Sequence, residues 1–324
     1  MTTVPEAMVT WSLLTSSRTR AAFDPSRVVL RDGNRRGAVA VRARQGVARR
    51  AEPASVGPLV LEARSGAGEV VCEVWGPPRT PADEAARALD AAVAWAGLRD
   101  DPGALREVAA GHPVVAGLLR RLGEVRLSRI PRVGEALGRS VLSQLVQGGE
   151  AQHSILGVAA CAGTEAPGRL WTWPSADQLG AVPAWTLRRC GVSLRGAKSL
   201  HAGALADRRL TEAVADFAML DRRLRALPGV GAWTSAETRL ALGDPDAVSV
   251  GDYHLPTVVG SVLTQRPTAR AEGVFDDAAM VALLAPFAGQ RGRVIRLCEL
   301  AAGRLVPDVP RRGPRVAPSA HRYW

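Results

Sequence analysis

The chain contains 324 residues, enough for two domains with buried cores, and 47% of them are hydrophobic. Charged residues make up 23%, a balance that excludes a disordered chain, and no apolar stretch is long enough to span a bilayer. The first 23 residues lack a basic segment ahead of an apolar one. We therefore predict no signal peptide and expect a cytoplasmic protein.

Basic residues outnumber acidic ones by 42 to 31, which gives a net charge of +11, and Lys198 is the only lysine. The excess grows toward the C-terminal end, where residues 303–324 carry five arginines and one aspartate. Such a surplus permits the binding of a polyanion such as nucleic acid without requiring it. The four cysteines form no closely spaced pair, so we expect neither a zinc ribbon nor an iron–sulfur cluster.

The predicted elements begin with an irregular N-terminus, residues 1–27, and a small α+β domain, residues 28–115. A helix is predicted to start at Thr80, with a proline in its first turn. Alternating apolar residues predict three short strands of a small antiparallel sheet: Ala38–Arg42, Leu59–Ala63 and Glu69–Trp75.

Residues 116–305 are predicted to be all-α, because turns with proline or glycine separate most of a series of short helical patterns. Residues 306–324 are predicted to form an extended basic tail rich in proline and arginine. The predicted helices are Val114–Leu122, Gly134–Val146, Gln152–Cys161, Ser175–Leu179, Pro183–Cys190, Gly196–Ala206, Leu210–Leu227, Trp233–Leu242, Leu255–Leu263, Asp277–Phe287 and Arg291–Ala302.

The most informative segment is Leu224–Leu255, with the sequence LRALPGVGAWTSAETRLALGDPDAVSVGDYHL. A Pro-Gly-Val-Gly turn joins two predicted helices, and Gly229 and Gly231 leave its backbone N–H groups uncovered. Together with the unpaired amides at the start of the second helix, these groups suit a phosphate. Asp252 follows 21 residues after Gly231, in the sequence Val-Gly-Asp-Tyr.

This segment resembles the helix-hairpin-helix DNA glycosylase superfamily, in which such a hairpin precedes a catalytic aspartate. Within that superfamily the chain looks most like the 3-methyladenine DNA glycosylase II type. The sequence Leu-Ser-Gln-Leu-Val at residues 142–146 and the strand-rich front part also match that type. The resemblance implies an α+β N-terminal domain followed by an all-α helix-hairpin-helix glycosylase domain.

The resemblance also implies roles for single residues. Asp252 would be the catalytic carboxylate, and Trp233 and Tyr253 would border the base pocket. Leu145 would fill the space left by an extruded nucleotide, with Gln144 beside it. The remaining implied roles belong to the hairpin: backbone amides of Gly229, Gly231 and Thr234 would bind a DNA phosphate, and carbonyls of Leu227 and Val230 could hold a sodium or potassium ion.

The physical logic of such an enzyme fits these residues. A nucleotide must leave the duplex before its glycosidic bond can be attacked, and a fixed carboxylate stabilises the positive charge that cleavage builds on the sugar. A base that is already cationic leaves without strong acid assistance and is attracted to an indole such as that of Trp233. Bifunctional relatives use a lysine near the hairpin, where this chain has Ala232 and Trp233.

We therefore expect a monofunctional, monomeric DNA glycosylase that acts on double-stranded DNA at the nucleoid. It would excise alkylated purines of the 3-methyladenine type in base-excision repair and need no cofactor, apart from the alkali ion. Two other functions stay open: a glycosylase for a neutral deaminated or oxidised base, and a non-catalytic damage sensor.

Several residues have alternative interpretations. Asp252 could cap the following helix, and Trp233 and Leu145 could be core residues. Glu237 stands where the family usually has an aromatic residue, so it could attract a cationic base, protonate a neutral one or pair with a surface arginine. Relatives often have a pocket tryptophan where this chain has Arg296-Leu297-Cys298-Glu299. Packing roles are expected for Trp171, Trp173 and Trp185, and turn roles for Asp244 and Asp246.

Overall fold

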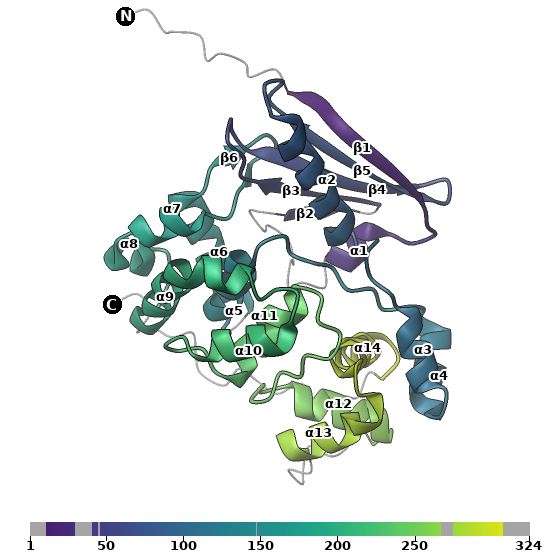
Figure 1. Cartoon of the computed structure of the whole chain (residues 1–324). Helices are drawn as coiled ribbons and strands as arrows, with labels where there is room; N and C mark the ends of the chain where they lie inside the picture. Colours follow the sequence, from purple (N-terminus) through teal and green to yellow (C-terminus); the bar gives the residue numbers. More distant parts are fainter. Residues whose placement is uncertain (1–10, 30–40, 45, 147, 267–274, 307–324) are drawn as a thin grey trace, which may run out of the picture.

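The computed structural model describes residues 11–29, 41–44, 46–146, 148–266 and 275–306. A five-stranded sheet with two helices forms one end of the molecule, and the remaining helices form the rest (Figure 1). Within the described ranges, no helix is both long and apolar enough to cross a membrane. The predicted basic tail lies outside the described residues, apart from Val306.

The sheet has the strand order β1-β5-β4-β3-β2, and all neighbouring strands are antiparallel. Ala67 and Gly68 join β4 to β5 with positive φ angles of 52° and 78°, a two-residue turn that matches the twist of the hairpin. One face packs against helix α2 (Ala82–Trp95) through a buried cluster that includes Leu61 and Trp95. The strands are β1 (Ser12–Arg20), β2 (Val41–Arg44), β3 (Val47–Glu52), β4 (Leu59–Gly66) and β5 (Glu69–Gly76).

The predicted small antiparallel sheet is confirmed, but it has two strands that the sequence pattern did not predict. Strand β1 lies inside the N-terminus that was expected to be irregular, and β3 lies between two predicted strands. Strand β1 is at the edge of the sheet and none of its residues is fully buried, so its side chains lack the apolar alternation that marks a strand. Residues 38–40 of one predicted strand lie outside the described residues.

The helices form two groups, each with its own buried core. The first packs around Leu137, Trp173 and Leu200, and the second around Leu105, Val259 and Phe287. Helix α11 (Ala232–Ala241) contacts α5 and α10 of the first group. The first group contains α5 (Val133–Leu142), α6 (Gly148–Ala162), α7 (Ala176–Ala181), α8 (Ala184–Arg189), α9 (Leu194–Thr211) and α10 (Phe217–Arg225). The second contains α3 (Gly103–Ala109), α4 (Pro113–Leu122), α12 (Leu255–Thr264), α13 (Asp277–Leu284), η3 (Ala285–Phe287) and α14 (Arg291–Arg304).

Two short elements complete the fold. Helix α1 (Pro25–Val29) lies against the sheet, and the strand pair β6 (Glu165–Ala166) and β7 (Leu170–Trp171) packs on the face opposite α2. The packing role predicted for Trp173 is confirmed, since its side chain is 1% exposed. The same prediction was wrong for Trp185, which is 63% exposed on α8.

Two of the predicted helices are interrupted by turns in the structure. The predicted helix Gly134–Val146 ends at Leu142, because the chain turns at Ser143–Leu145 and Leu145 has a φ of 55°. The predicted helix Leu210–Leu227 is interrupted before Phe217. The cause is Asp216, whose carboxylate accepts hydrogen bonds from the amides of Ala218 and Met219, both at 3.0 Å, and so starts a new helix.

A buried ion network joins the sheet to α5. Arg50 of β3 is fully buried, and its Nη2 donates to Oε2 of Glu135 at 2.6 Å and pairs with Glu52. Burial alone would raise the pKa of Glu135, but the charges of Arg50, Arg139 and Arg132 hold that pKa below its usual value. The network therefore fixes α5, which ends at Leu142, relative to the sheet.

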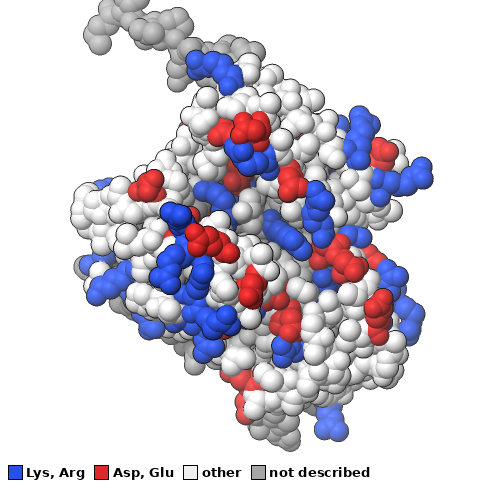
Figure 2. Space-filling model, in the orientation of Figure 1, with Lys and Arg blue, Asp and Glu red and all other residues white. Residues whose placement is uncertain are grey.

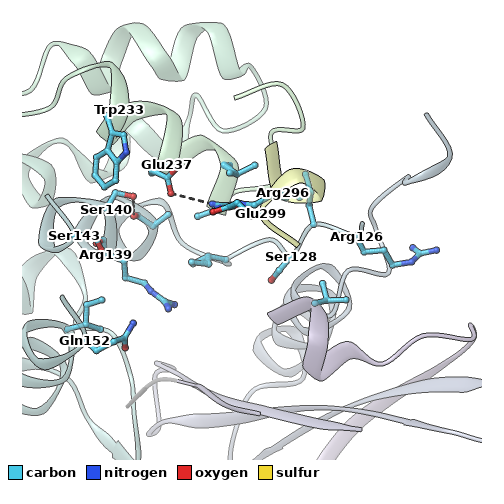
Figure 3. A pocket seen from close by; sticks show the side chains of 17 residues that line it. Arg126, Ser128, Arg139, Ser140, Ser143, Gln152, Trp233, Glu237, Arg296 and Glu299 are labelled. Atoms are coloured by element: carbon cyan, nitrogen blue, oxygen red, sulfur yellow. Dashed lines mark hydrogen bonds and ion pairs between the residues drawn. The ribbon is translucent and has the colours of Figure 1, made fainter. Parts of the chain in front are cut away.

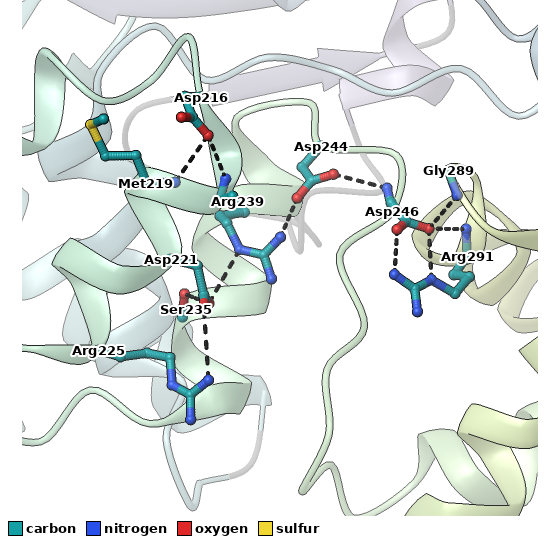
Figure 4. Close-up of polar contacts among 11 residues, drawn as sticks. Asp216, Met219, Asp221, Arg225, Ser235, Arg239, Asp244, Asp246, Gly289 and Arg291 are labelled. Carbon is teal, nitrogen blue, oxygen red and sulfur yellow. Dashed lines mark hydrogen bonds and ion pairs between the residues drawn. The ribbon is translucent and has the colours of Figure 1, made fainter. Parts of the chain in front are cut away.

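A second polar network fixes α11 and the loop that follows it (Figure 4). Ser235 donates to Asp221 of α10 at 2.6 Å, and Arg239 pairs with Asp244. The Asp246 carboxylate accepts hydrogen bonds from the Gly289 amide at 2.8 Å and from Nε of Arg291 at 2.8 Å. Burial would raise the pKa of Asp246, but these hydrogen bonds lower it overall. The aspartates of the Gly-Asp-Pro-Asp sequence therefore tie the loop together, as the predicted turn roles require.

Candidate active site

The hairpin between α10 and α11 is a tight turn in which Gly229 is packed against α9 and Gly231 faces open space. Gly229 has a φ of 78°, and a Cβ atom there would lie 2.3 Å from Oγ of Ser199 on α9. Ser199 Oγ donates to the Pro228 carbonyl at 2.8 Å, which holds the turn against α9. A Cβ on Gly231 would meet no atom within 4 Å. The predicted phosphate-binding turn therefore has one glycine for packing and one beside open space.

Gln144 holds this hairpin from the other side. Its Nε2 donates to the Gly229 carbonyl at 2.9 Å and to Oγ1 of Thr234 at 2.7 Å. The structure thus brings together three residues that the sequence placed on the DNA-binding surface. Thr234 is 3% exposed, so its side chain stabilises the turn and is not accessible to a ligand.

Leu145 is the most exposed apolar side chain of this turn, and its backbone is strained. Its side chain is 81% exposed, and its φ of 55° is a left-handed conformation that costs a leucine about 1–2 kcal/mol. An exposed leucine in a strained turn has no packing role, so the alternative of a core leucine was wrong.

Asp252 is held by three hydrogen bonds at the start of α12. Its Oδ1 accepts from the amides of His254 at 2.7 Å and Leu255 at 2.9 Å, and its Oδ2 accepts from the Trp233 indole Nε1 at 2.8 Å. Asp252 lies two residues before His254, the N-cap position of α12, so the N-cap alternative was wrong; the carboxylate instead makes a hydrogen-bonded turn with the segment that enters the helix. This turn fixes the direction of the carboxylate, and the helix dipole favours its negative charge. The indole fixes Asp252 relative to α11.

Trp233 and Glu237 line a cavity of about 280 Å³ (Figure 3). Asp252 is not among the lining residues and is joined to the cavity wall through the Trp233 indole. Oε2 of Glu237 pairs with Nη2 of Arg296 at 3.3 Å, and Oε1 accepts a hydrogen bond from Ser249. Nη1 of Arg296 also pairs with Glu299 at 2.7 Å. Glu237 is therefore a pocket residue and an arginine partner at once, which joins two of the roles considered for it.

Tyr253 differs from its predicted place. It is half-buried and its ring lies 5.0 Å from that of His254, but it is not among the side chains that line the cavity. The prediction that Tyr253 borders the same pocket as Trp233 was wrong.

Sequence reasoning missed part of the cavity wall. Arg139 and Ser140 of α5, Gln152 of α6, and Arg126 and Ser128 of the segment before α5 line it together with Trp233. Arg139 could have been found, because it and Glu135 are the two charged residues of a helix that is otherwise apolar or small, and they stand four residues apart on one face. The others come from segments whose proximity no local pattern reveals.

The carbonyl groups predicted to hold an alkali ion lie in the hairpin. The Leu227 carbonyl accepts the Val230 amide at 3.2 Å, which closes the turn. Since a carbonyl oxygen has two lone pairs, this hydrogen bond is compatible with an ion, and the alkali-ion site stays a prediction.

Comparison with known proteins identifies the fold. No protein-family model and no curated protein matches the chain. A solved 3-methyladenine DNA glycosylase from Archaeoglobus fulgidus is 17% identical with a TM-score of 0.71, over 89% of this chain and 99% of that one. An 8-oxoguanine glycosylase/lyase from Clostridium acetobutylicum, in complex with DNA, is 14% identical with a TM-score of 0.62, over 82% and 88% of the two chains. A Schizosaccharomyces pombe 3-methyladenine DNA glycosylase in complex with abasic DNA is 18% identical with a TM-score of 0.51, over 61% and 96%. The chain has the fold of the helix-hairpin-helix DNA glycosylases.

Proposed function

We propose that this protein is a monofunctional DNA glycosylase that extrudes a damaged nucleotide from double-stranded DNA and hydrolyses its N-glycosidic bond. The observation that carries the proposal is the Asp252 carboxylate, which two backbone amides and the indole of Trp233 hold in place, while the same indole lines a cavity of about 280 Å³. The fold shared with DNA glycosylases of two substrate types supports the same class of activity.

The DNA backbone would bind at the hairpin and on the basic surface near it. The open space at Gly231 lets a phosphate approach the amides at the start of α11. Figure 2 shows Lys and Arg side chains gathered where Figure 1 has α9 and α10, and the exposed ones there include Arg208, Arg209, Arg222 and Arg225. Such a surface attracts phosphates at long range, and this binding would weaken as salt increases.

Leu145 would stabilise the extruded state. Extrusion costs a few kcal/mol because stacking and pairing are lost, and an apolar wedge that fills the gap offsets part of this cost. The 81% exposure of Leu145 means that its side chain exchanges water for bases when DNA binds. Gln144 beside it ties the wedge turn to the hairpin, so phosphate binding and insertion would occur together.

Asp252 would act on the sugar. Cleavage builds positive charge on the deoxyribose, and a carboxylate whose direction is already fixed stabilises that charge without reorganisation. The hydrogen bonds to Asp252 use two acceptor sites on Oδ1 and one on Oδ2, so the second site on Oδ2 remains for the sugar or an attacking water.

The reaction would leave the strand intact. A lyase step requires an amine that forms a Schiff base with the sugar, and the chain has one lysine, Lys198, on α9. The start of α11 offers Ala232 and Trp233 instead. The alkali ion proposed for the Leu227 and Val230 carbonyls would stabilise the hairpin and take no part in the chemistry.

Two classes of base are candidates for the cavity. Alkylated purines of the 3-methyladenine type, the class predicted from the sequence, are supported by the indole of Trp233 in the cavity wall. A neutral deaminated or oxidised base is supported by the ion pair between Glu237 and Arg296, which supplies both hydrogen-bond acceptors and donors.

The test is release of free bases from damaged DNA. Duplexes with single lesions are incubated with the protein, released bases are measured by mass spectrometry, and strand cleavage is compared before and after alkali. We expect base release with strand breaks only after alkali. Binding of lesion DNA without release would instead identify a damage sensor, and breaks before alkali would contradict a monofunctional reaction.

A further inference from the structure

The C-terminal half of α6 is packed closely against the end of α8. A Cβ atom on Gly157 of α6 would lie 2.8 Å from the Cβ atom of Cys190, the C-cap residue of α8. Ser154, on the preceding turn of α6, donates from its Oγ to the Gly191 carbonyl at 3.1 Å. The backbone on which Cys190 stands is therefore fixed against α6.

A second cysteine, Cys161, stands on the same face of α6. It follows Gly157 by four residues, which is about one helical turn. Side chains of a helix lean toward its N-terminus, so the Cys161 thiol leans back toward the turn that contains Gly157. Its Sγ donates to the Val158 carbonyl of that turn at 3.5 Å. Two thiols that are 29 residues apart in the sequence thus meet where α6 and α8 touch.

The two thiols have different surroundings. Cys161 is exposed, whereas Cys190 is half-buried. Burial and, after it, the charge and hydrogen bonding of the neighbouring Cys161 thiol raise the pKa of Cys190 to about 12. Since the thiolate is the reactive form, Cys190 is a poor first nucleophile at neutral pH. Cys161 is the thiol that a dissolved oxidant reaches first.

We infer that Cys161 and Cys190 form a reversible disulfide in the folded protein when it meets a peroxide. The Cys161 thiolate attacks one peroxide oxygen, the O–O bond breaks, and the hydroxide that leaves takes up a proton. The Cys190 sulfur then attacks the Cys161 sulfenic acid. The S–S bond forms, the S–O bond breaks, and the hydroxyl group leaves with the Cys190 proton as water. Two thiols lose two electrons in total, and hydrogen peroxide is reduced to two waters.

The bond would close a loop of the chain between residues 161 and 190, which contains β6, β7, α7 and α8. Strand β7 contacts β3 of the sheet, and α7 and α8 contact α9. Closing this loop lowers the entropy of the unfolded chain, so oxidation should stabilise the fold.

The other two cysteines serve as internal standards. Cys72 lies in the core beside the sheet and Cys298 in the core of the second group of helices, and both are fully buried. Burial also raises the pKa of the Cys72 thiol to about 12. In the folded protein neither thiol is accessible to a peroxide, and their separate cores keep them apart.

The experiment uses the reduced full chain and hydrogen peroxide. Remaining thiols are blocked with N-ethylmaleimide under denaturing conditions, and the protein is digested with trypsin and analysed by mass spectrometry. We expect the peptides Ser140–Arg169 and Cys190–Arg195 to be joined by a bond that dithiothreitol separates, with Cys72 and Cys298 carrying the blocking group. The Tm of the oxidised protein should be about 5 °C higher than that of the reduced protein.

Three variants test the order of the steps and the geometry. Cys161→Ser should leave Cys190 unoxidised and abolish the rise in Tm. Cys190→Ser should accumulate the Cys161 sulfenic acid, which dimedone traps. The matched control combines Cys161→Ala with Ala160→Cys, because it keeps one exposed thiol on α6 but turns it about 100° around the helix. It should form no disulfide with Cys190.

Oxidation of Cys161 that stops at the sulfenic or sulfinic acid, a disulfide between two molecules, or an unreacted Cys161 overturns the inference. An equal or lower Tm after oxidation also overturns it, because the folded state then does not place the thiols for this bond. Equal disulfide formation in the matched control has the same consequence. None of these measurements involves base release, so the inference and the proposed function are tested separately.

Discussion

Replacing Asp252 by Asn is the most direct test of the site, because it removes the charge while keeping one acceptor oxygen. That oxygen can still accept hydrogen bonds from the His254 and Leu255 amides at the start of α12. The NH2 group then faces the Trp233 indole N–H, so one hydrogen bond is lost, at a cost of about 1 kcal/mol in folding stability. The fold should therefore persist with a small decrease in Tm.

The effect on base release should be far larger. A unit charge about 4 Å from the cationic sugar, in an effective dielectric of about 20, contributes about 4 kcal/mol to the transition state. This corresponds to a rate loss of about a thousandfold. DNA affinity should change little, because the phosphates bind at the hairpin and the basic surface.

Single-turnover base release, DNA binding and thermal unfolding measure these three quantities. The matched control is Asp216→Asn, since the Asp216 carboxylate also accepts two backbone amides, both at 3.0 Å, and caps α10, the helix before the hairpin. It should leave base release unchanged. A loss of less than about tenfold in Asp252→Asn, or an equal loss in both variants, would refute the catalytic assignment.

Three further predictions concern the wedge, the hairpin and the loop that anchors α11. Leu145→Gly should lower base release about tenfold, while relief of the φ of 55° leaves stability unchanged or raises it by up to about 1 kcal/mol. Leu205→Ala, which shortens a side chain that is 89% exposed, is the control and should change neither base release nor stability. A loss of stability in Leu145→Gly would contradict the wedge role. Gly229→Ala should destabilise the fold by about 1–3 kcal/mol, because its Cβ would meet Ser199. Gly231→Ala should fold normally and bind DNA more weakly, because its Cβ would lie in the open space beside the turn. Equal unfolding midpoints of the two variants in urea would contradict this difference. Asp246→Asn should lower stability at neutral pH by about 1–2 kcal/mol. The pKa of Asp246 is lowered by folding, so this difference is present above its ordinary value of 3.8 and is lost as the pH falls through the lower folded value; a difference that persists in acid would disprove the ionic contribution.

The parts of the site that sequence could predict are those encoded in one continuous segment. The hairpin, Trp233 and Asp252 lie within 25 residues of one another, and the glycines and helix signals fix their local geometry. The start of α11 at residue 232 was predicted to within one residue. Their proximity follows from short-range turns, so the structure agrees with the pattern.

Residues from distant segments could not be placed in the same way. The cavity joins Arg126 and Arg139 to Glu299, which follows them in the chain only after helices α6 to α13. Trp185 was assigned to packing because a tryptophan is usually buried, but α8 is a short helix with one buried residue, Leu187. Strand β1 was missed because its stability comes from pairing with β5, a contact that no local alternation reveals.

The contact between Arg50 and Glu135 attaches the sheet to α5, the helix that leads into the Gln144–Leu145 turn. Loss of Glu135 would leave the buried Arg50 with Glu52 alone, and loss of Arg50 would leave the buried Glu135 with only the longer contacts to Arg139 and Arg132; the 2.6 Å contact spans 85 residues of chain. Aligned sequences of relatives should therefore exchange both residues jointly or keep both. A shortened protein that begins after the sheet would leave Glu135 of α5 without Arg50, and we expect such a fragment to be less soluble than the full chain.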